Sequence, residues 1–192
     1  MDPRTGALIS TICLVAALAT VQWDVLLNLP TAVHDLMTAD RLAHQALSEK
    51  DRGDALMRDA SRAVSAAGSN PLAVLAAAPR IVRDVTEAYR HYERSLRLAE
   101  EGLRHLDRGL RLIGATSDPE IRRALDLMWE GLAGYRRALS EFHRGVVAAR
   151  SGDFNAALRH VNASYRLMRR ADQRFRQGRS MLEDKTLLFM GG

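Results

Sequence analysis

The feature that most constrains this chain is a stripe of apolar residues that recurs at alternating steps of four and three. Between Glu120 and Arg150 the stripe is unbroken. Its members are Ile121, Leu125, Met128, Leu132, Tyr135, Leu139, Phe142, Val146 and Ala149. This spacing predicts a long α-helix with one apolar seam facing a partner helix, as in coiled coils and antiparallel bundles. Ser117, Pro119 and Glu120 mark its start as a capping box.

Other segments carry related patterns. A stripe from Ile81 to Ile113 stops before Gly114, a residue suited to a left-handed helix end. After the turn Ser151-Gly152-Asp153, large residues recur at every seventh position, namely Phe154, Val161, Met168, Phe175 and Leu182. Small residues lie between them, namely Ala157, Ser164, Ala171 and Gly178. We therefore expect the large residues to fill a seam and the small ones to let a neighbouring helix approach closely. A less regular helix is expected over residues 31–67, where polar residues would allow a break near Gly53.

Together these segments predict an all-α fold, an up-and-down bundle of long helices with coiled-coil-like heptads over residues 31–192. No alternating pattern typical of strands competes. The chain has 192 residues, 47% of them hydrophobic, and a net charge of +5, which excludes wholesale disorder. Its single cysteine, Cys13, excludes a disulfide-bonded scaffold.

The N-terminal region has a different character, because no charged residue occurs from Ala7 to Trp23. As a helix continued to Pro30, this stretch is long enough to cross a bilayer. Residues 1–30 are thus predicted to be an N-terminal single transmembrane helix that anchors the bundle. The predicted anchor residues are Ala7, Leu8, Ile9, Ile12, Leu14, Val15, Leu18, Val21 and Trp23.

Two other interpretations of this stretch stay open. Ala17-Leu18-Ala19 fits the cleavage site of a signal peptide, and the stretch also suits a buried helix of a soluble domain. For the anchor, Arg4 precedes the segment and acidic residues follow it, so the positive-inside rule places the N-terminus in the cytoplasm. The bundle would then lie on the outer side of the membrane.

The last helix carries a row of arginines with few acids. The predicted contact residues for anionic lipid or a partner are Arg159, Arg166, Arg169, Arg170 and Arg174. Such a row favours phosphate or an acidic protein surface, whereas the alternative is a solvated helix face. Nucleic acid is disfavoured because the aromatic residues lie on the seam and do not alternate with the arginines.

Three acid and histidine pairs lie four residues apart: Asp40/His44, Glu87/His91 and Glu101/His105. We expect them to be ion pairs on single helices, since a metal site in a bundle needs inward ligands from several helices. The chain contains no recognised catalytic, nucleotide-binding or metal-binding motif. We therefore predict that it is not an enzyme and carries no cofactor or metal.

One hairpin resembles a known repeat. Gly145, Gly152-Asp153-Phe154, Ala157-Leu158 and Ser164 resemble the turn between the two helices of a tetratricopeptide repeat, over about residues 140–168. The resemblance implies peptide capture in a helical groove.

The predicted function is that of a non-enzymatic, membrane-anchored scaffold, or an accessory or assembly subunit of a larger membrane complex, acting by protein–protein contact. Its expected partners are membrane lipid, other protein subunits and anionic headgroups. The alternative is a soluble or exported tetratricopeptide-like module that binds a peptide or anionic ligand through its last two helices.

Overall fold

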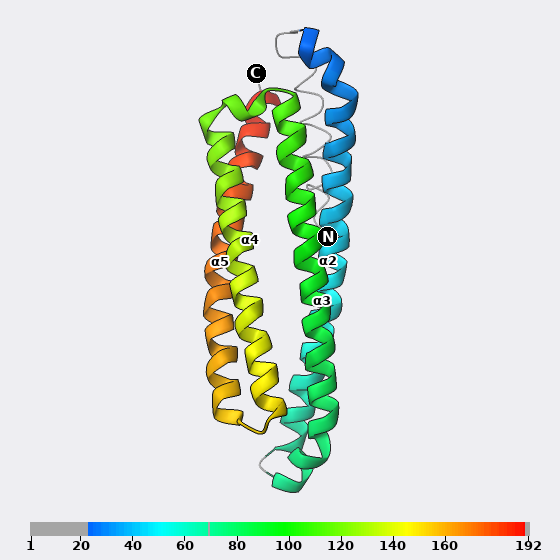
Figure 1. Ribbon diagram of the computed structural model, residues 1–192, viewed down its shortest axis with the longest axis vertical. Helices are drawn as coiled ribbons and strands as arrows, with labels where there is room; N and C mark the ends of the chain where they lie inside the picture. Colours follow the sequence, from blue (N-terminus) through cyan, green and yellow to red (C-terminus); the bar gives the residue numbers. More distant parts are fainter. Residues whose placement is uncertain (1–22, 69, 191–192) are drawn as a thin grey trace. The chain divides into compact units, whose positions relative to one another are not determined.

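The computed structural model describes residues 23–68 and 70–190, and nearly all of them are helical. Four α-helices follow in chain order: α2 (Trp23–Ala67), α3 (Pro71–Leu112), α4 (Pro119–Arg150) and α5 (Phe154–Met190). A short 3-10 helix, η1 (Ala115–Ser117), joins α3 to α4 (Figure 1). The described ranges contain no strand. The prediction of an all-α helical bundle is confirmed.

The helix ends follow local chemistry. The side chain of Asn70 accepts a hydrogen bond from the amide of Leu72 (3.1 Å) and so caps the start of α3. Gly114 has a φ of 73°, the left-handed conformation predicted for it after α3. At the start of α4 the cap is Asp118, whose Oδ1 accepts the amide of Glu120 (2.7 Å). The predicted capping box is therefore wrong, because the Ser117 hydroxyl instead donates to the carbonyl of Gly114.

Helix α2 runs without interruption through two positions where the sequence indicated an end or a break. Pro30 lies inside the helix, and Ala32 and Leu36, in the turns that follow, are buried. Packing thus outweighs the loss of one backbone hydrogen bond at the proline. Gly53 is also helical, and a Cβ there would lie 2.8 Å from the ring of Tyr92. The glycine makes room for that ring.

The predicted transmembrane helix is corrected by the structure. Within residues 23–68 and 70–190, no helix combines the length and the apolar character that a membrane span requires. Helix α2 carries Asp35, Asp40 and Arg41 shortly after the end of the predicted span, and Asp35 is buried. The predicted single-pass localisation and cytoplasmic N-terminus are corrected with it. The predicted anchor residues from Ala7 to Val21 lie outside the described residues, and Trp23 is the first residue of α2.

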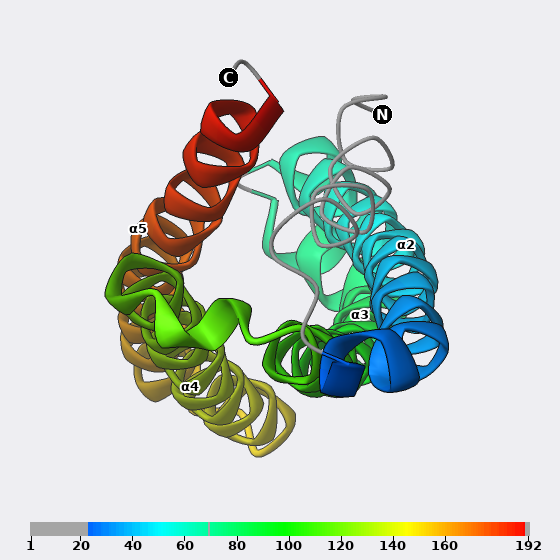
Figure 2. The ribbon, with the colours of Figure 1, turned by 90° about the horizontal axis from the view of Figure 1, so that it is seen from above.

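The chain divides into two compact units. Unit 1 takes in the chain up to His44, Leu98–Ala133 and the chain from Arg170 onward, and unit 2 takes in Gln45–Arg97 and Gly134–Arg169. Each unit therefore contains one segment of each helix. In both views α2 lies beside α3 and α4 lies beside α5 (Figures 1 and 2).

In unit 1 the helices of each pair approach closely. A Cβ on Gly109 of α3 would lie 2.9 Å from Leu36 Cγ of α2. A Cβ on Gly178 of α5 would meet the carbonyl oxygen of Ala124 on α4. Glycine favours this close approach because a side chain at either position would meet atoms of the neighbouring helix.

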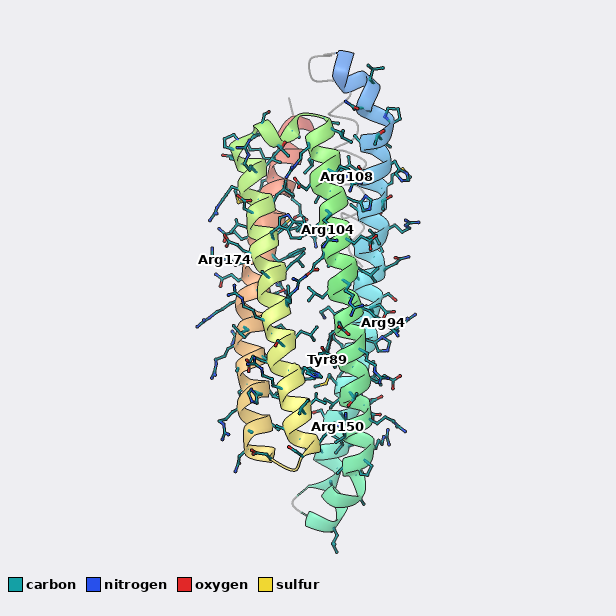
Figure 3. All side chains as sticks on the ribbon, viewed as in Figure 1. Tyr89, Arg94, Arg104, Arg108, Arg150 and Arg174 are labelled. Atoms are coloured by element: carbon teal, nitrogen blue, oxygen red, sulfur yellow. The ribbon has the colours of Figure 1, made fainter. Side chains whose placement is uncertain are left out.

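The core of unit 2 lies between α4 and the helices α2 and α3. Its buried centre on α4 consists of Leu139, Phe142 and Val146. Partly buried residues that pack against this centre are Met57, Val85, Tyr89, Tyr92 and Leu96. The rings of Tyr89 and Tyr92 lie 6.4 and 6.3 Å from that of Phe142, at distances typical of paired aromatic side chains. Tyr89 is labelled on α3 in Figure 3.

The contact line of α5 differs from the predicted seam. The small residues Ala157, Ser164, Ala171 and Gly178 are buried at seven-residue intervals. Val161, expected to fill the seam, is exposed. On α4 the facing line is also small: Ala124, Gly131, Ala138 and Gly145. The small residues let the two helices approach closely, as predicted. Val161 lies beside this line of contact, whereas Leu182, also predicted for the seam, is buried.

Candidate functional site

Histidine side chains form hydrogen bonds between paired helices, α2 with α3 and α4 with α5. Nδ1 of His91 on α3 lies 2.8 Å from Oε2 of Glu49 on α2. In the second pair of helices, Nδ1 of His160 on α5 lies 2.8 Å from Oε2 of Glu141 on α4. Because an ionised carboxylate only accepts hydrogen bonds, the ring nitrogen is the donor in each pair. These interactions cross between helices, so they join each pair of helices rather than turns of one helix.

The predicted partners of two histidines are therefore wrong. His91 pairs with Glu49 in place of Glu87, and His105 Nδ1 lies 2.6 Å from Asp35 Oδ1. Glu101 is thus not the partner of His105. For His44 the predicted proximity to Asp40 is found, since its Nδ1 lies 3.5 Å from Asp40 Oδ1, but its hydrogen bond at 2.9 Å is with the backbone carbonyl oxygen of Asp40. Interhelical pairing depends on which helices meet, which the spacing within one helix does not reveal.

The carboxyl groups of these pairs respond to their partners. The hydrogen bond from His91 lowers the pKa of Glu49, although burial opposes the shift. The hydrogen bond from His160 lowers the pKa of Glu141 in the same way. Both glutamates are therefore held in the ionised form. Across the described part of the chain, no group of three or more metal-ligating side chains could hold a metal ion.

An internal repeat relates the two pairs of helices. The pattern A-L-S-E-x-x-R-G-x-x-x-x-R occurs at Ala46–Arg58 on α2 and again at Ala138–Arg150 on α4. The partner helices share a second pattern, A-x-R-H-x-x-x-S-x-R-L, at Ala88–Leu98 on α3 and Ala157–Leu167 on α5. The histidine and glutamate of each pair belong to these patterns, so the two pairs of helices are two copies of one hairpin.

The geometry of the two copies agrees. The hydroxyl of Ser95 donates to the carbonyl of Ala46 at 2.7 Å, and that of Ser164 donates to the carbonyl of Ala138 at 2.7 Å. The sequence interpretation missed this repeat because it sought copies at one fixed period. The connection between the two patterns is longer in the first copy than in the second, so no single period relates them. A search for each short pattern separately would have found it.

One surface of unit 2 stands out by its exposure. Leu158, Val161 and Tyr165 lie on one face of α5 and are 61, 39 and 62% exposed. Their spacing of three and four residues aligns them along the helix. We call these three residues the α5 apolar face. Because these three exposed side chains adjoin one another, they form a candidate interaction surface.

The predicted arginine row lies partly beside this face. Arg159, Arg166 and Arg169 belong to unit 2, are exposed and form no ion pair with any described residue. Arg170 and Arg174 belong to unit 1. The Nε of Arg174 lies 3.8 Å from Glu130 Oε2, so this arginine, labelled in Figure 3, has a partner on α4. The first three arginines can therefore contribute, with the α5 apolar face, to one surface.

Comparison with known proteins found no family model, no curated protein and no solved structure that matches this chain. The resemblance of residues 140–168 to a tetratricopeptide hairpin stays a prediction. The internal repeat allows each surface of one copy to be compared with the equivalent surface of the other copy.

Proposed function

We propose that this protein is a non-enzymatic helical scaffold or accessory protein that acts by protein–protein contact, and that its contact surface includes the α5 apolar face. The observation that supports this function is the exposure of Leu158 and Tyr165, at 61 and 62%, next to arginines that form no ion pair with a described residue. Burying two such side chains would release water from a large apolar area, which is the main favourable term in protein association.

A second candidate uses the same surface. A peptide or anionic ligand bound through the last two helices would also satisfy Arg159, Arg166 and Arg169. The exposed apolar side chains favour a protein partner, because phosphate or a headgroup alone would leave Leu158 and Tyr165 in water. A ligand recognised only by charge would be insensitive to those two residues.

Site-specific photo-crosslinking in the native host tests the proposed contact. A photoreactive amino acid is placed at Leu158 or Tyr165 of the full chain. We expect discrete protein adducts from both positions, identified by mass spectrometry. Leu72 provides the matched control, because it is also in unit 2 and is 76% exposed but lies on α3. Equal adducts from Leu72, or none from Leu158 and Tyr165, would contradict the proposal.

A further inference from the structure

The internal repeat specifies what kind of partner fits the α5 apolar face. Three positions of α3 are equivalent to it in the repeat: Tyr89, Tyr92 and Leu96. In the first copy this face is covered, because all three side chains pack against α4. The same face therefore exists twice, once covered by a helix and once exposed.

The covering element in the first copy is a single helix with a simple pattern. It presents Leu139, Phe142 and Val146, which are spaced by three and four residues and are buried. A helix of this pattern would cover the α5 apolar face in the same manner, as a row of large side chains seated between those of α5. Helix α4 is thus a template for an element that would cover the α5 apolar face.

The charge of the occupant follows from differences between the two copies. In α3 the Nη2 of Arg97 pairs with Oε1 of Glu93 at 2.8 Å. Arg166 of α5 is equivalent to Arg97, but the position equivalent to Glu93 is Asn162. The acid that neutralises the arginine is therefore missing.

A second position is also more basic in α5 than in α3. Glu100 of α3 is equivalent to Arg169 of α5, so an acid is replaced by a base. Arg169 lies one turn beyond Tyr165, at the end of the α5 apolar face. The border of the exposed face is thus basic, and an acidic partner would supply carboxylates to Arg166 and Arg169.

A second copy of this chain fits poorly. Two α5 helices facing each other would bring arginines against arginines, which disfavours association. The α2 segment equivalent to the covering helix carries Lys50 and Asp54 where α4 has Phe142 and Val146. Asp54 also has a hydrogen-bond partner within the chain, since its Oδ1 accepts a hydrogen bond from the hydroxyl of Tyr92 at 2.7 Å.

We infer that the α5 apolar face binds one amphipathic helix of another protein, with large apolar residues spaced like Leu139, Phe142 and Val146 and acidic residues beside them. This inference rests on the proposed function and adds the structure and charge of the partner. In the complex, the partner helix would contact α5 as α4 contacts α3.

Synthetic helical peptides test the inference with the full chain. The first peptide carries Leu, Phe and Val at the spacing found in α4, with glutamates at the flanking positions. The second has lysines in place of the glutamates, and the third keeps the glutamates but has serines in place of the apolar residues. Affinities are measured by fluorescence anisotropy at low and high salt. We expect the first peptide to bind at least about tenfold more tightly than either of the others.

Variants of the protein locate the binding surface. The double variant Leu158→Ser, Tyr165→Ser should weaken binding of the first peptide by at least about tenfold. Leu72→Ser is its control and should have no effect. Replacing Arg159, Arg166 and Arg169 with Gln should weaken binding and reduce its salt dependence. A control variant with the same change in net charge has Gln in place of Arg62, Arg97 and Arg111. These exposed arginines each have an acidic partner on their own helix.

Each other result would overturn the inference. Failure of the first peptide to bind would reject a helical partner, while crosslinked adducts at Leu158 and Tyr165 would still support the proposed contact. Equal binding of the third peptide would indicate a surface for anions alone. Equal binding of the second peptide would reject an acidic partner. Dimers in sedimentation that dissociate in the Leu158→Ser, Tyr165→Ser variant would identify a second copy as the occupant.

Discussion

Within unit 2, the segments of the first and second hairpins share a sequence pattern but differ in whether one face of their second helix is covered. Both have the serine that bonds across the helices and the pair of histidine and glutamate. Tyr89, Tyr92 and Leu96 of α3 are covered by Phe142 and its neighbours, whereas the equivalent α5 apolar face is exposed. The comparison teaches that the repeated residues determine how a hairpin closes, and that the remaining residues determine what it contacts.

The largest expected effect separates the covered face from the exposed one. Phe142→Ala removes the centre of the core and should lower the free energy of unfolding by about 3–5 kcal/mol. Leu158→Ala, on the exposed face, should change it by about 0.5 kcal/mol or less. Urea unfolding monitored by circular dichroism measures both. A loss of about 2 kcal/mol or more in Leu158→Ala would mean that the α5 apolar face is already covered.

The next prediction concerns how closely the two helices of each hairpin approach each other at one equivalent position. A Cβ on Gly178 would meet the backbone oxygen of Ala124, which cannot move aside, so Gly178→Ala should destabilise by about 2–3 kcal/mol. In the first hairpin the equivalent residue is Gly109, where a Cβ would lie 3.2 Å from the oxygen of Ala32. Gly109→Ala should cost about 1 kcal/mol, because overpacking is partly offset by higher helix propensity. Equal losses in thermal unfolding would contradict the difference in closeness.

A smaller effect concerns pH. The pKa of Glu49 and of Glu141 is lowered in the folded state by the bond from the paired histidine. Each group therefore stabilises the fold above its ordinary pKa of 4.5, and this contribution is lost as the pH falls through the folded-state value. Glu49→Gln and Glu141→Gln should each lower the Tm at pH 7 and flatten its fall below pH 4.5.

Glu87→Gln is the control for this experiment. Glu87 lies one turn from His91 and is exposed, and it is the partner that the spacing within α3 predicted. Its replacement should leave the pH dependence of the Tm unchanged. A flattening as large as that of Glu49→Gln would restore the pairing within one helix and contradict the interhelical one.

The smallest effect tests whether the two copies are equivalent. Ser164→Ala and Ser95→Ala each remove one hydrogen bond to a helix carbonyl, a change of roughly 0.5–1.5 kcal/mol. Ser164 is more deeply buried than Ser95, so its loss should be at the upper end of that range. Urea unfolding of both single variants measures the difference. A large loss in only one of them would show that the shared serine has different roles in the two hairpins.

Much of the fold could be predicted from the sequence because helix periodicity is a local property. The stripe from Ile121 to Val146 correctly indicated the buried side of α4, and Gly114 correctly marked the end after α3. The prediction was wrong where long-range contacts decide. Pro30 and Gly53 stay inside α2 because the packing around them compensates, which no pattern within α2 reveals.

The candidate site was predicted only in part. The five arginines of the predicted row all belong to α5, but the sequence did not distinguish Arg174, which pairs with Glu130, from Arg166, which has no ion pair with a described residue. The α5 apolar face was missed because Val161 was assigned to a buried seam. Large residues at seven-residue intervals suggest burial, yet the small residues between them make the contact.

The sequence by itself determined that the chain forms long helices, where most of them end, and that two copies of one hairpin pattern occur. Each of these depends on neighbouring residues or on identical residues at two sites. Only the tertiary structure decided which histidine meets which acid and which apolar side chains remain in water. Those outcomes depend on the distance between helix backbones, which is short at Gly178, where a Cβ would meet the carbonyl oxygen of Ala124.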